Sequence, residues 1–292
     1  MTRTYAIPVA GWDSPFCPET RQVALQALEQ GQVLYFPSLA FPLAQVERRF
    51  LSPAILGRAK NVSYNPATKA VAGTVCQGQD AEELKGLLGR YADAADRLCR
   101  RLFPFYGSAL ERERTSLRPA VIEGRRTSWR KDDTRLHVDS FPSQPVRGRR
   151  ILRLFCNVNP QGRARTWRVG EPFSEMAKRF WPRLTPSRWL RRKLLCWLRV
   201  THGLRSEYDH YMLQLHDAMK KSAYYQRSVS QQTIDFPAGT AWACFTDQVS
   251  HAALAGQHQL EQTFTLPVEA MQDRSTAPLA FLEKLAGRPL AA

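Results

Sequence analysis

Two potential metal ligands stand two positions apart in the segment His137-Val138-Asp139. Alternate residues of a β-strand point to the same face of a sheet, so a strand end here would project the His137 imidazole and the Asp139 carboxylate side by side. These are two of the three ligands in the two-histidine, one-carboxylate site that binds Fe(II) and leaves positions open for O2 and a chelating cosubstrate. The segment is therefore a candidate metal centre.

The third ligand must come from another strand, and His251 is the best candidate for it. His251 follows the segment 245–250, starts a new β-like run and lies 112 positions after Asp139. The three-residue motif alone is common, and the alternative is a surface histidine beside an aspartate in a turn. The remaining histidines lack such a setting and are expected to be structural or to lie on the surface: His202, His210, His216 and His258.

Short β-like runs surround these candidates in the second half of the chain. They are separated by turn residues, notably at 237–239 and 255–256. The predicted strands cover 119–123, 134–138, 150–158, 229–236, 240–245, 250–254 and 259–267. Many short strands with flanking helices predict a sandwich or barrel of jelly-roll type. The interval from about 170 to 227 does not continue this series of short β-like runs and is predicted to be a helical insertion.

The first half of the chain carries helical periodicity. Apolar spacing predicts a helix over 19–30 that leads into a strand at 32–37, and a long helix over 81–105 with one apolar stripe that packs across a sheet. With 292 residues, 43% of them apolar, the chain is long enough for one large core. We therefore predict a single domain over 1–292 that includes the insertion.

The charge of the chain points to an anionic partner. Lys and Arg number 42 against 26 Asp and Glu, a formal net charge of +16, and nine of the basic residues lie between 176 and 206, where there is no acid. Such a balance suits a nucleic acid, an acidic membrane surface or an anionic substrate.

Targeting and cysteine patterns restrict the compartment. No stretch approaches the roughly 20 consecutive apolar residues of a membrane span, and the first residues lack a signal-peptide pattern, so a cytoplasmic protein is expected. The six cysteines lie far apart without a CxxC pair, which argues against a disulfide framework or a thiolate zinc site.

Four segments together are much more specific than the histidine motif. They are RKDDTRLHVDSFP at 130–142, RILRLFCNVNP at 150–160, FTDQVSHA at 245–252 and EQTF at 261–264. With these segments the chain resembles the Kdo 3-hydroxylases from about residue 20 to residue 268. These enzymes are Fe(II)- and 2-oxoglutarate-dependent dioxygenases that hydroxylate 3-deoxy-D-manno-oct-2-ulosonic acid (Kdo) in the lipopolysaccharide inner core.

The resemblance implies a mainly β fold with flanking helices, built on a double-stranded β-helix core of the jelly-roll or cupin type. His137, Asp139 and His251 match the iron ligands of the family. The implied cofactor is Fe(II), the cosubstrates are 2-oxoglutarate and O2, and the implied substrate is a Kdo-bearing lipid A precursor. One alternative is the same chemistry on another anionic substrate such as a nucleic acid, which we favour less. The other is a non-enzymatic basic protein that binds membranes or nucleic acid.

The chain departs from many 2-oxoglutarate oxygenases in one respect. These enzymes often place an Arg or Lys shortly after the distal histidine to pair with the far carboxylate of the cosubstrate, but positions 261–263 are Glu-Gln-Thr. Strand alternation places Arg153 between apolar neighbours on one face of 150–158, where a buried guanidinium needs an anion. We expect Arg153 to take this role, unless its face is the outer one. The further pocket candidates are Arg150 as the reserve cation, Asn157, Gln262 and the pair Trp167-Arg168.

Two further basic regions could contact the substrate or a membrane. Cations in 60–64 and 128–131 are expected near the mouth of the site, where a sugar acid would enter, although a generic basic surface is the alternative. In 187–199, one helical stripe holds Trp189, Leu190, Leu194, Trp197 and Leu198, and Arg188, Arg191, Arg192 and Arg199 surround it. This pattern is typical of a helix that lies in a membrane interface. We therefore expect peripheral association with the anionic inner leaflet. The alternative is a helix packed on the core, and no dedicated protein partner is inferred.

Overall fold

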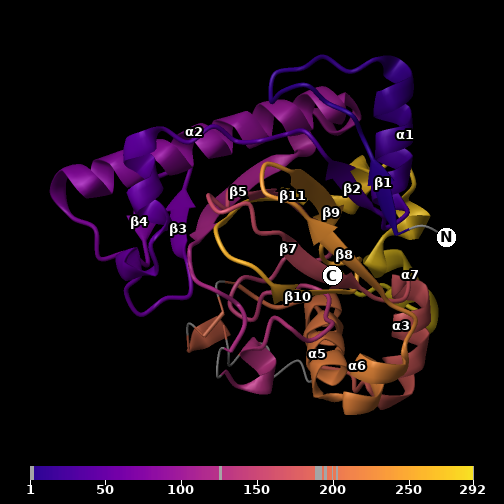
Figure 1. Cartoon of the computed structure of the whole chain (residues 1–292). Helices are drawn as coiled ribbons and strands as arrows, with labels where there is room; N and C mark the ends of the chain where they lie inside the picture. Colours follow the sequence, from indigo (N-terminus) through magenta and orange to yellow (C-terminus); the bar gives the residue numbers. More distant parts are fainter. Residues whose placement is uncertain are drawn as a thin grey trace.

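Two β-sheets with helices on both sides form the core of the protein (Figure 1). The computed structural model describes residues 3–124, 127–187, 193, 196–198, 200–201 and 203–291. The larger sheet has the strand order β1-β2-β9-β6-β11-β5-β3-β4, and the smaller sheet has the order β10-β7-β8.

The larger sheet carries its longest strands at its centre. Its members in spatial order are β1 (Thr4–Ala6), β2 (Val33–Phe36), β9 (Ala241–Phe245), β6 (Arg150–Asn157), β11 (Gln259–Leu266), β5 (Glu111–Arg118), β3 (Val62–Asn65) and β4 (Ala70–Ala72). All neighbours pair antiparallel except β1 and β2. Strand β6 lies between β9 and β11, so its inward side chains reach the middle of the molecule.

The smaller sheet faces the larger one across an aromatic cluster. Its strands are β10 (His251–Ala255), β7 (Arg165–Val169) and β8 (Gln232–Phe236), and His137 adds an isolated bridge to β10. Phe155 and Trp242 from the larger sheet contact Trp167 and Phe236 from the smaller one, with ring centroids 4.1–5.5 Å apart. This arrangement of the two sheets is the predicted double-stranded β-helix.

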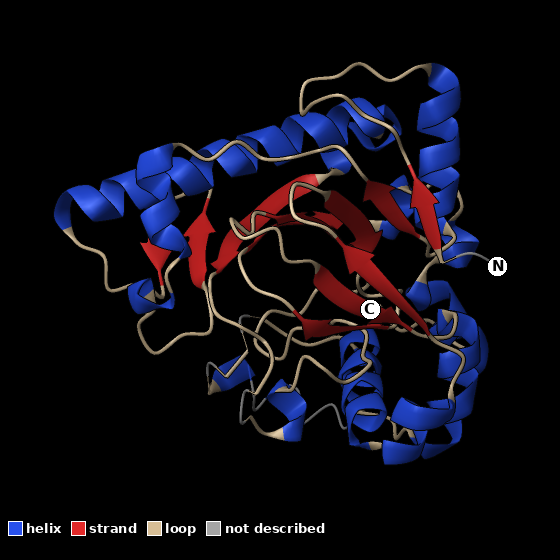
Figure 2. Cartoon of the chain, in the orientation of Figure 1, coloured by secondary structure: helices blue, strands red, loops and turns tan. Residues whose placement is uncertain are grey.

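Helices cover the outer face of the larger sheet (Figure 2). They are α1 (Pro18–Glu29) and α2 (Gly78–Leu102), close to their predicted positions. The apolar stripe of α2 is buried, and the Tyr91 hydroxyl donates a hydrogen bond to the Leu154 carbonyl at 3.0 Å. This face therefore forms the main hydrophobic core, and the inner face stays available for the site.

The remaining helices gather beside the smaller sheet (Figure 1). Three belong to the predicted insertion: α3 (Phe173–Phe180), α5 (Glu207–Lys221) and α6 (Ala223–Ser228). The C-terminal helix α7 spans Pro278–Ala286. Short 3-10 helices complete the structure: η1 (Gln45–Leu51), η2 (Pro53–Ile55), η3 (Pro104–Ala109), η4 (Trp129–Lys131), η5 (Trp181–Arg183), η6 (Val268–Ala270) and η7 (Arg274–Thr276).

Helix α5 is fixed to the rest of the chain at its first turn. Ser206 and Asp209 form a capping box, in which the Ser206 hydroxyl accepts a hydrogen bond from the Asp209 amide and the Asp209 carboxylate accepts one from the Ser206 amide. The other Asp209 oxygen accepts hydrogen bonds from the amides of Val146 and Arg147 at 2.9 and 3.0 Å. The buried Asp209 side chain therefore ties the insertion to the loop before β6.

Two predicted strands are wrong. Residues 119–123 are not a strand, because β5 ends at Arg118, and in 134–138 only His137 makes a bridge. Strand β5 begins with the charged run Glu111-Arg112-Glu113-Arg114, so it lacks the apolar alternation by which a strand is detected. Strands β1, β3, β4 and β7 were not predicted either.

A buried ion pair connects β6 to the turn that precedes His251. Arg150 Nε lies 2.7 Å from Asp247 Oδ2, and the two side chains are 0% and 1% exposed. Arg150 Nη2 donates to Gln248 Oε1, and Asp247 Oδ1 accepts a hydrogen bond from the Ile151 amide. The pair therefore fixes the turn between β9 and β10.

Replacement of Arg150 by Met should destabilise the fold by about 3–5 kcal/mol, because the Asp247 carboxylate would be left buried and unpaired. The double variant Arg150→Met, Asp247→Leu should recover much of this loss. Urea denaturation followed by circular dichroism measures both, with Arg149→Met as the control on the same segment. Equal stability of the single variant and the parent would contradict the assigned role of the pair.

Candidate metal centre and pocket

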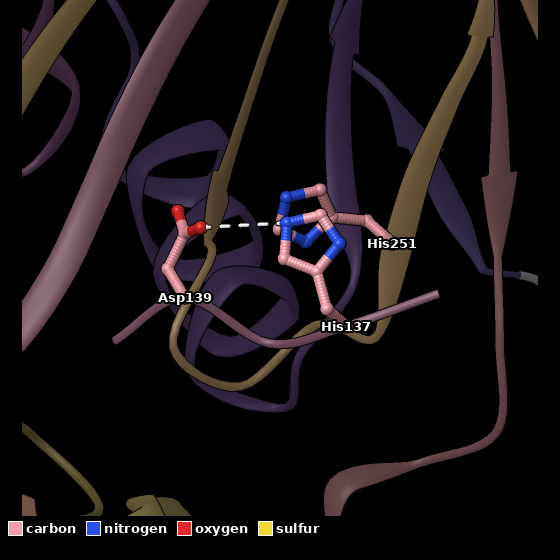
Figure 3. Close-up of side chains that lie close together, drawn as sticks. All are labelled: His137, Asp139 and His251. Atoms are coloured by element: carbon pink, nitrogen blue, oxygen red, sulfur yellow. Dashed lines mark ion pairs between the residues drawn. The ribbon is translucent and has the colours of Figure 1, made fainter. Parts of the chain in front are cut away.

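The backbone itself brings the three predicted ligands together. His137 and His251 exchange two hydrogen bonds, from each amide to the other carbonyl, at 3.0 and 2.9 Å. The Asp139 amide donates to the Thr246 carbonyl at 2.8 Å. As a result, one potential ligand atom from each of His137, Asp139 and His251 lies within 4.8 Å of the others (Figure 3).

Both imidazoles are oriented by hydrogen bonds to main-chain carbonyl groups. His137 Nδ1 lies 2.8 Å from the Arg135 carbonyl oxygen, and His251 Nδ1 lies 2.8 Å from the Val249 carbonyl oxygen. A carbonyl oxygen only accepts, so these contacts favour the tautomer with the proton on Nδ1. The Nε2 lone pair of each ring is then available to a metal, which is the usual arrangement of histidine ligands.

The charge state of the cluster also suits metal binding. Burial lowers the pKa of His137 and of His251, which favours neutral imidazoles. Burial alone would raise the pKa of Asp139, but the Arg153 guanidinium and the two imidazoles hold that pKa well below its usual range. Two neutral nitrogen donors and one carboxylate result, and this donor set fits Fe(II).

A cavity of about 290 Å³, here called the metal pocket, adjoins the cluster. Trp167 stacks on the His251 ring with centroids 5.1 Å apart, and Phe155 closes the apolar end against Trp167. These rings exclude water from one side of the cluster. The prediction that Trp167 lines the pocket is thus confirmed, whereas Arg168 hydrogen-bonds to Gln226, Gln231 and Thr134 outside it.

Three arginines from three strands line the metal pocket. Arg153 on β6 lies with Nη1 3.1 Å from Asp139 Oδ2 and 3.3 Å from Glu261 Oε1. Arg118, the last residue of β5, pairs with the other Glu261 oxygen at 3.0 Å, and Arg165 begins β7. Arg153 therefore faces inward, which decides between the two faces that the sequence left open, and the pocket suits anionic ligands.

Helix α5 lines the opening of the metal pocket. His216 packs edge-on against His137, with ring centroids 5.4 Å apart, and Lys220 follows one turn later. The prediction that His216 is merely structural or on the surface is wrong, because the insertion folds over the metal cluster. The i, i+4 spacing of His216 and Lys220 was a detectable signal, but sequence alone does not tell which side of a helix faces the site.

Three of the predicted pocket residues do not line the metal pocket. Arg150 points to the opposite face of β6, where Asp247 pairs with it. The Asn157 amide donates to the carbonyls of Arg163 and Phe236, and so supports a strand end. Gln262 bonds to Thr115 on the outer face of β11, while its neighbour Glu261 faces inward. The sequence analysis therefore expected Gln262 on the inner face of β11, but Glu261 occupies that face.

Two larger cavities adjoin the metal pocket. The strand-side cavity, of about 710 Å³, lies between β3, β5, β11 and the loop 141–149, and it shares Arg118, Arg153 and Glu261 with the metal pocket. The helix-side cavity, of about 900 Å³, lies between α5 and residues 183–187, and it shares Arg130, Pro142 and His216. The metal pocket thus has neighbouring space on two sides.

Comparisons with known proteins agree with this geometry. The family model for 3-deoxy-D-manno-oct-2-ulosonic acid (Kdo) hydroxylase matches residues 11–289. A crystal structure of the Kdo hydroxylase KdoO, a non-heme Fe(II) and α-ketoglutarate dependent dioxygenase, in complex with cobalt(II) is 46% identical with a TM-score of 0.98, and the match covers 100% of this chain and 98% of that one. The complex of KdoO with α-ketoglutarate and Fe(III) is 46% identical with a TM-score of 0.97, over 99% and 97% of the two chains. A search of curated proteins found no match.

Substitution of any ligand candidate, as in His137→Ala, Asp139→Ala or His251→Ala, should abolish stoichiometric binding of Fe(II) or Co(II) and leave the fold largely intact. The reason is that the pairing of these segments is made by main-chain groups, which remain in the variants. Titration calorimetry and metal analysis measure the binding, and circular dichroism monitors the fold. His210→Ala, on the outer part of α5, is the control. An Asp139→Ala protein that retained one metal per chain would refute the assignment.

Proposed function

This chain belongs to the Kdo hydroxylase family, and we infer from that membership that it is an Fe(II)- and 2-oxoglutarate-dependent dioxygenase that hydroxylates Kdo. The observation that carries this inference within the chain is the cluster of His137, Asp139 and His251 in its buried pocket. In the balanced reaction, a Kdo C–H group, O2 and 2-oxoglutarate become C–OH, succinate and CO2. The substrate is a Kdo-bearing lipid A precursor.

The three clustered residues are proposed to hold the iron. His137 and His251 contribute Nε2, and Asp139 contributes a carboxylate oxygen. When bound, Fe(II) supplies the activation of O2 that is coupled to decarboxylation of 2-oxoglutarate. The chain fixes the ligand geometry through the backbone pairing of His137 with His251, and Trp167 and Phe155 keep water from one side of the reacting groups.

Arg153 is proposed to bind the far carboxylate of 2-oxoglutarate. Its side chain is mostly buried, and its Nε has no hydrogen-bond partner among the described residues. A guanidinium presents a planar fork of donors that matches a carboxylate. Glu261 balances the charge of Arg153 and Arg118 in the absence of a ligand, so the pocket can exist before the cosubstrate enters.

The exposed end of the insertion supports peripheral binding to an anionic membrane. Trp197 is 78% exposed, and Leu198 and Val200 are each 53% exposed, in a region where the sequence is strongly basic. Trp189, Leu190, Leu194 and all four arginines that surround the predicted stripe lie outside the described residues. Within the described part of the chain, no helix is long and apolar enough to cross a bilayer. The exposed Trp197 ring and the exposed Lys193 would lie at headgroup depth.

Arg153→Leu should raise the apparent binding constant for 2-oxoglutarate at least roughly tenfold, because a buried carboxylate loses its charge partner. Steady-state kinetics with varied 2-oxoglutarate measures this, and Arg112→Leu, on the outer side of β5, is the matched control. An unchanged constant would transfer the role to Arg118 or Arg165.

Purified protein with Fe(II), 2-oxoglutarate and a Kdo-bearing lipid A precursor should release succinate and add one oxygen atom to the Kdo unit. Mass spectrometry of the glycolipid and assay of succinate measure the two products. His251→Ala should yield neither product. Iron-dependent oxidation of a single-stranded oligonucleotide, with none of the glycolipid, would instead favour the nucleic-acid alternative.

The changes Trp189→Ser and Trp197→Ser together should reduce binding to anionic liposomes at every salt concentration. By contrast, changing Arg191, Arg192 and Lys193 to Gln should matter mainly at low salt, because screening removes much of the attraction at about 1 M ionic strength. Liposome co-sedimentation measures both effects. Activity on a water-soluble Kdo fragment should survive both changes. Undiminished sedimentation of the tryptophan variant, or its unfolding, would assign this helix to the core.

A further inference from the structure

The chemistry of the proposed substrate places a second anion inside the metal pocket. This placement of a second anion rests on the proposed function. In Kdo, the carboxyl carbon is bonded to C2, and C2 is bonded to C3, the position that is hydroxylated. Since C3 must approach the metal, the carboxylate two bonds away has to enter the same pocket. A carboxylate that leaves water needs a cation or several hydrogen-bond donors.

Two of the three strand arginines in the metal pocket are engaged with carboxylates of the chain. Arg118 pairs with Glu261, and Arg153 lies between Glu261 and Asp139. On the side of the insertion, Arg130 pairs with Asp217 at 2.9 Å and stacks on Trp129, with its side chain 63% exposed. Each of these cations has an anionic partner already.

Lys220 differs from these cations. The residue is only 2% exposed, and its ammonium group donates one hydrogen bond, to the neutral Arg130 carbonyl oxygen at 3.0 Å. An ammonium has three N–H donors, so this contact uses one of them. In the part of the chain that the structure describes, no carboxylate oxygen lies within 4.0 Å of Lys220 Nζ. The acids Asp133 and Asp139 act on this ammonium only from a distance. A buried cation without a direct ion pair is costly, and a bound anion would reduce that cost.

The position of Lys220 places its charge beside the reacting centre. Helix α5 presents His216 and Lys220 one turn apart to the metal pocket, and the His216 ring packs against the His137 ring. Arg135 donates to the Lys220 carbonyl at 2.8 Å, which fixes this last turn of the helix. Lys220 thus reaches the metal pocket from the insertion, whereas Arg118, Arg153 and Arg165 reach it from the strands.

We propose that Lys220 binds the carboxylate of the Kdo sugar and so orients C3 toward the metal. The arginines of the strands then serve the carboxylate of 2-oxoglutarate. This division assigns the two carboxylic acids of the reaction to different elements of the fold. It makes Lys220 a specificity-determining residue for sugar acids.

The test compares two Lys220 variants, one control variant and two substrates. Lys220→Met keeps the length of the side chain and removes its charge, Lys220→Arg keeps the charge, and Lys221→Met changes the exposed neighbour as the matched control. The substrates are a Kdo-bearing lipid A precursor and its Kdo methyl ester, which lacks the carboxylate charge. KM for each substrate and for 2-oxoglutarate is measured with the iron-loaded protein.

Lys220→Met should raise KM for the acid substrate roughly tenfold or more, with KM for 2-oxoglutarate within about twofold of the parent. The parent should prefer the acid to the ester, and Lys220→Met should lose most of this preference. Lys220→Arg should retain a large part of it, and Lys221→Met should match the parent.

Three results would overturn the proposal. They are a rise in KM for 2-oxoglutarate alone, a Lys220→Met protein that still discriminates acid from ester, and a parent that accepts both substrates equally. The last comparison needs no variant, so it can overturn the proposal even if Lys220→Met fails to fold. In that case the preference of Lys220→Arg for the acid over the ester supplies the variant readout. A parent that oxidises neither substrate would instead reject the proposed function itself.

Discussion

The pair of backbone hydrogen bonds between His137 and His251 is the contact on which the site depends. His137 belongs to no regular strand, yet these two bonds hold it beside the first residue of β10. Directly paired residues of an antiparallel ladder have neighbouring side chains, so the two imidazoles meet through the main chain alone. Asp139 follows two residues later on the same face, held by its amide to Thr246. The metal cluster is thus a product of strand pairing rather than of side-chain packing.

Charge balance is the second constraint on the pocket. The inner face of the larger sheet carries Arg153 beside the acids Asp139 and Glu261, in a place where unpaired charges would be costly. Buried carboxylates therefore hold the arginines in position before any ligand arrives. A pocket built in this way favours small dianions, since an entering carboxylate meets donors that are already oriented. The aromatic rings on the other side confine the reacting groups.

Local patterns predicted some of these features and not others. The alternation in β6 put Arg153 and Arg150 on opposite faces, and the structure shows that Arg153 faces the site while Arg150 is buried on the other face beside Asp247. In β11 the choice between Glu261 and Gln262 depends on which face is inner, and this is decided by the pairing of β11 with β5 and β6. The start of β5 was not predicted because its charged residues show no apolar alternation. The role of α5 was not predictable, because a helical insertion can fold over any edge of the core.

The carboxylate of Asp209 has a mechanical consequence. One of its oxygens caps α5, and the other holds the amides of Val146 and Arg147, while Val146 lines the strand-side cavity. The first turn of α5 is therefore joined directly to the rim of that cavity. Loss of the Asp209 side chain would remove the cap of α5 and both loop contacts together, so the start of the helix and the rim of this cavity would lose their order as one unit.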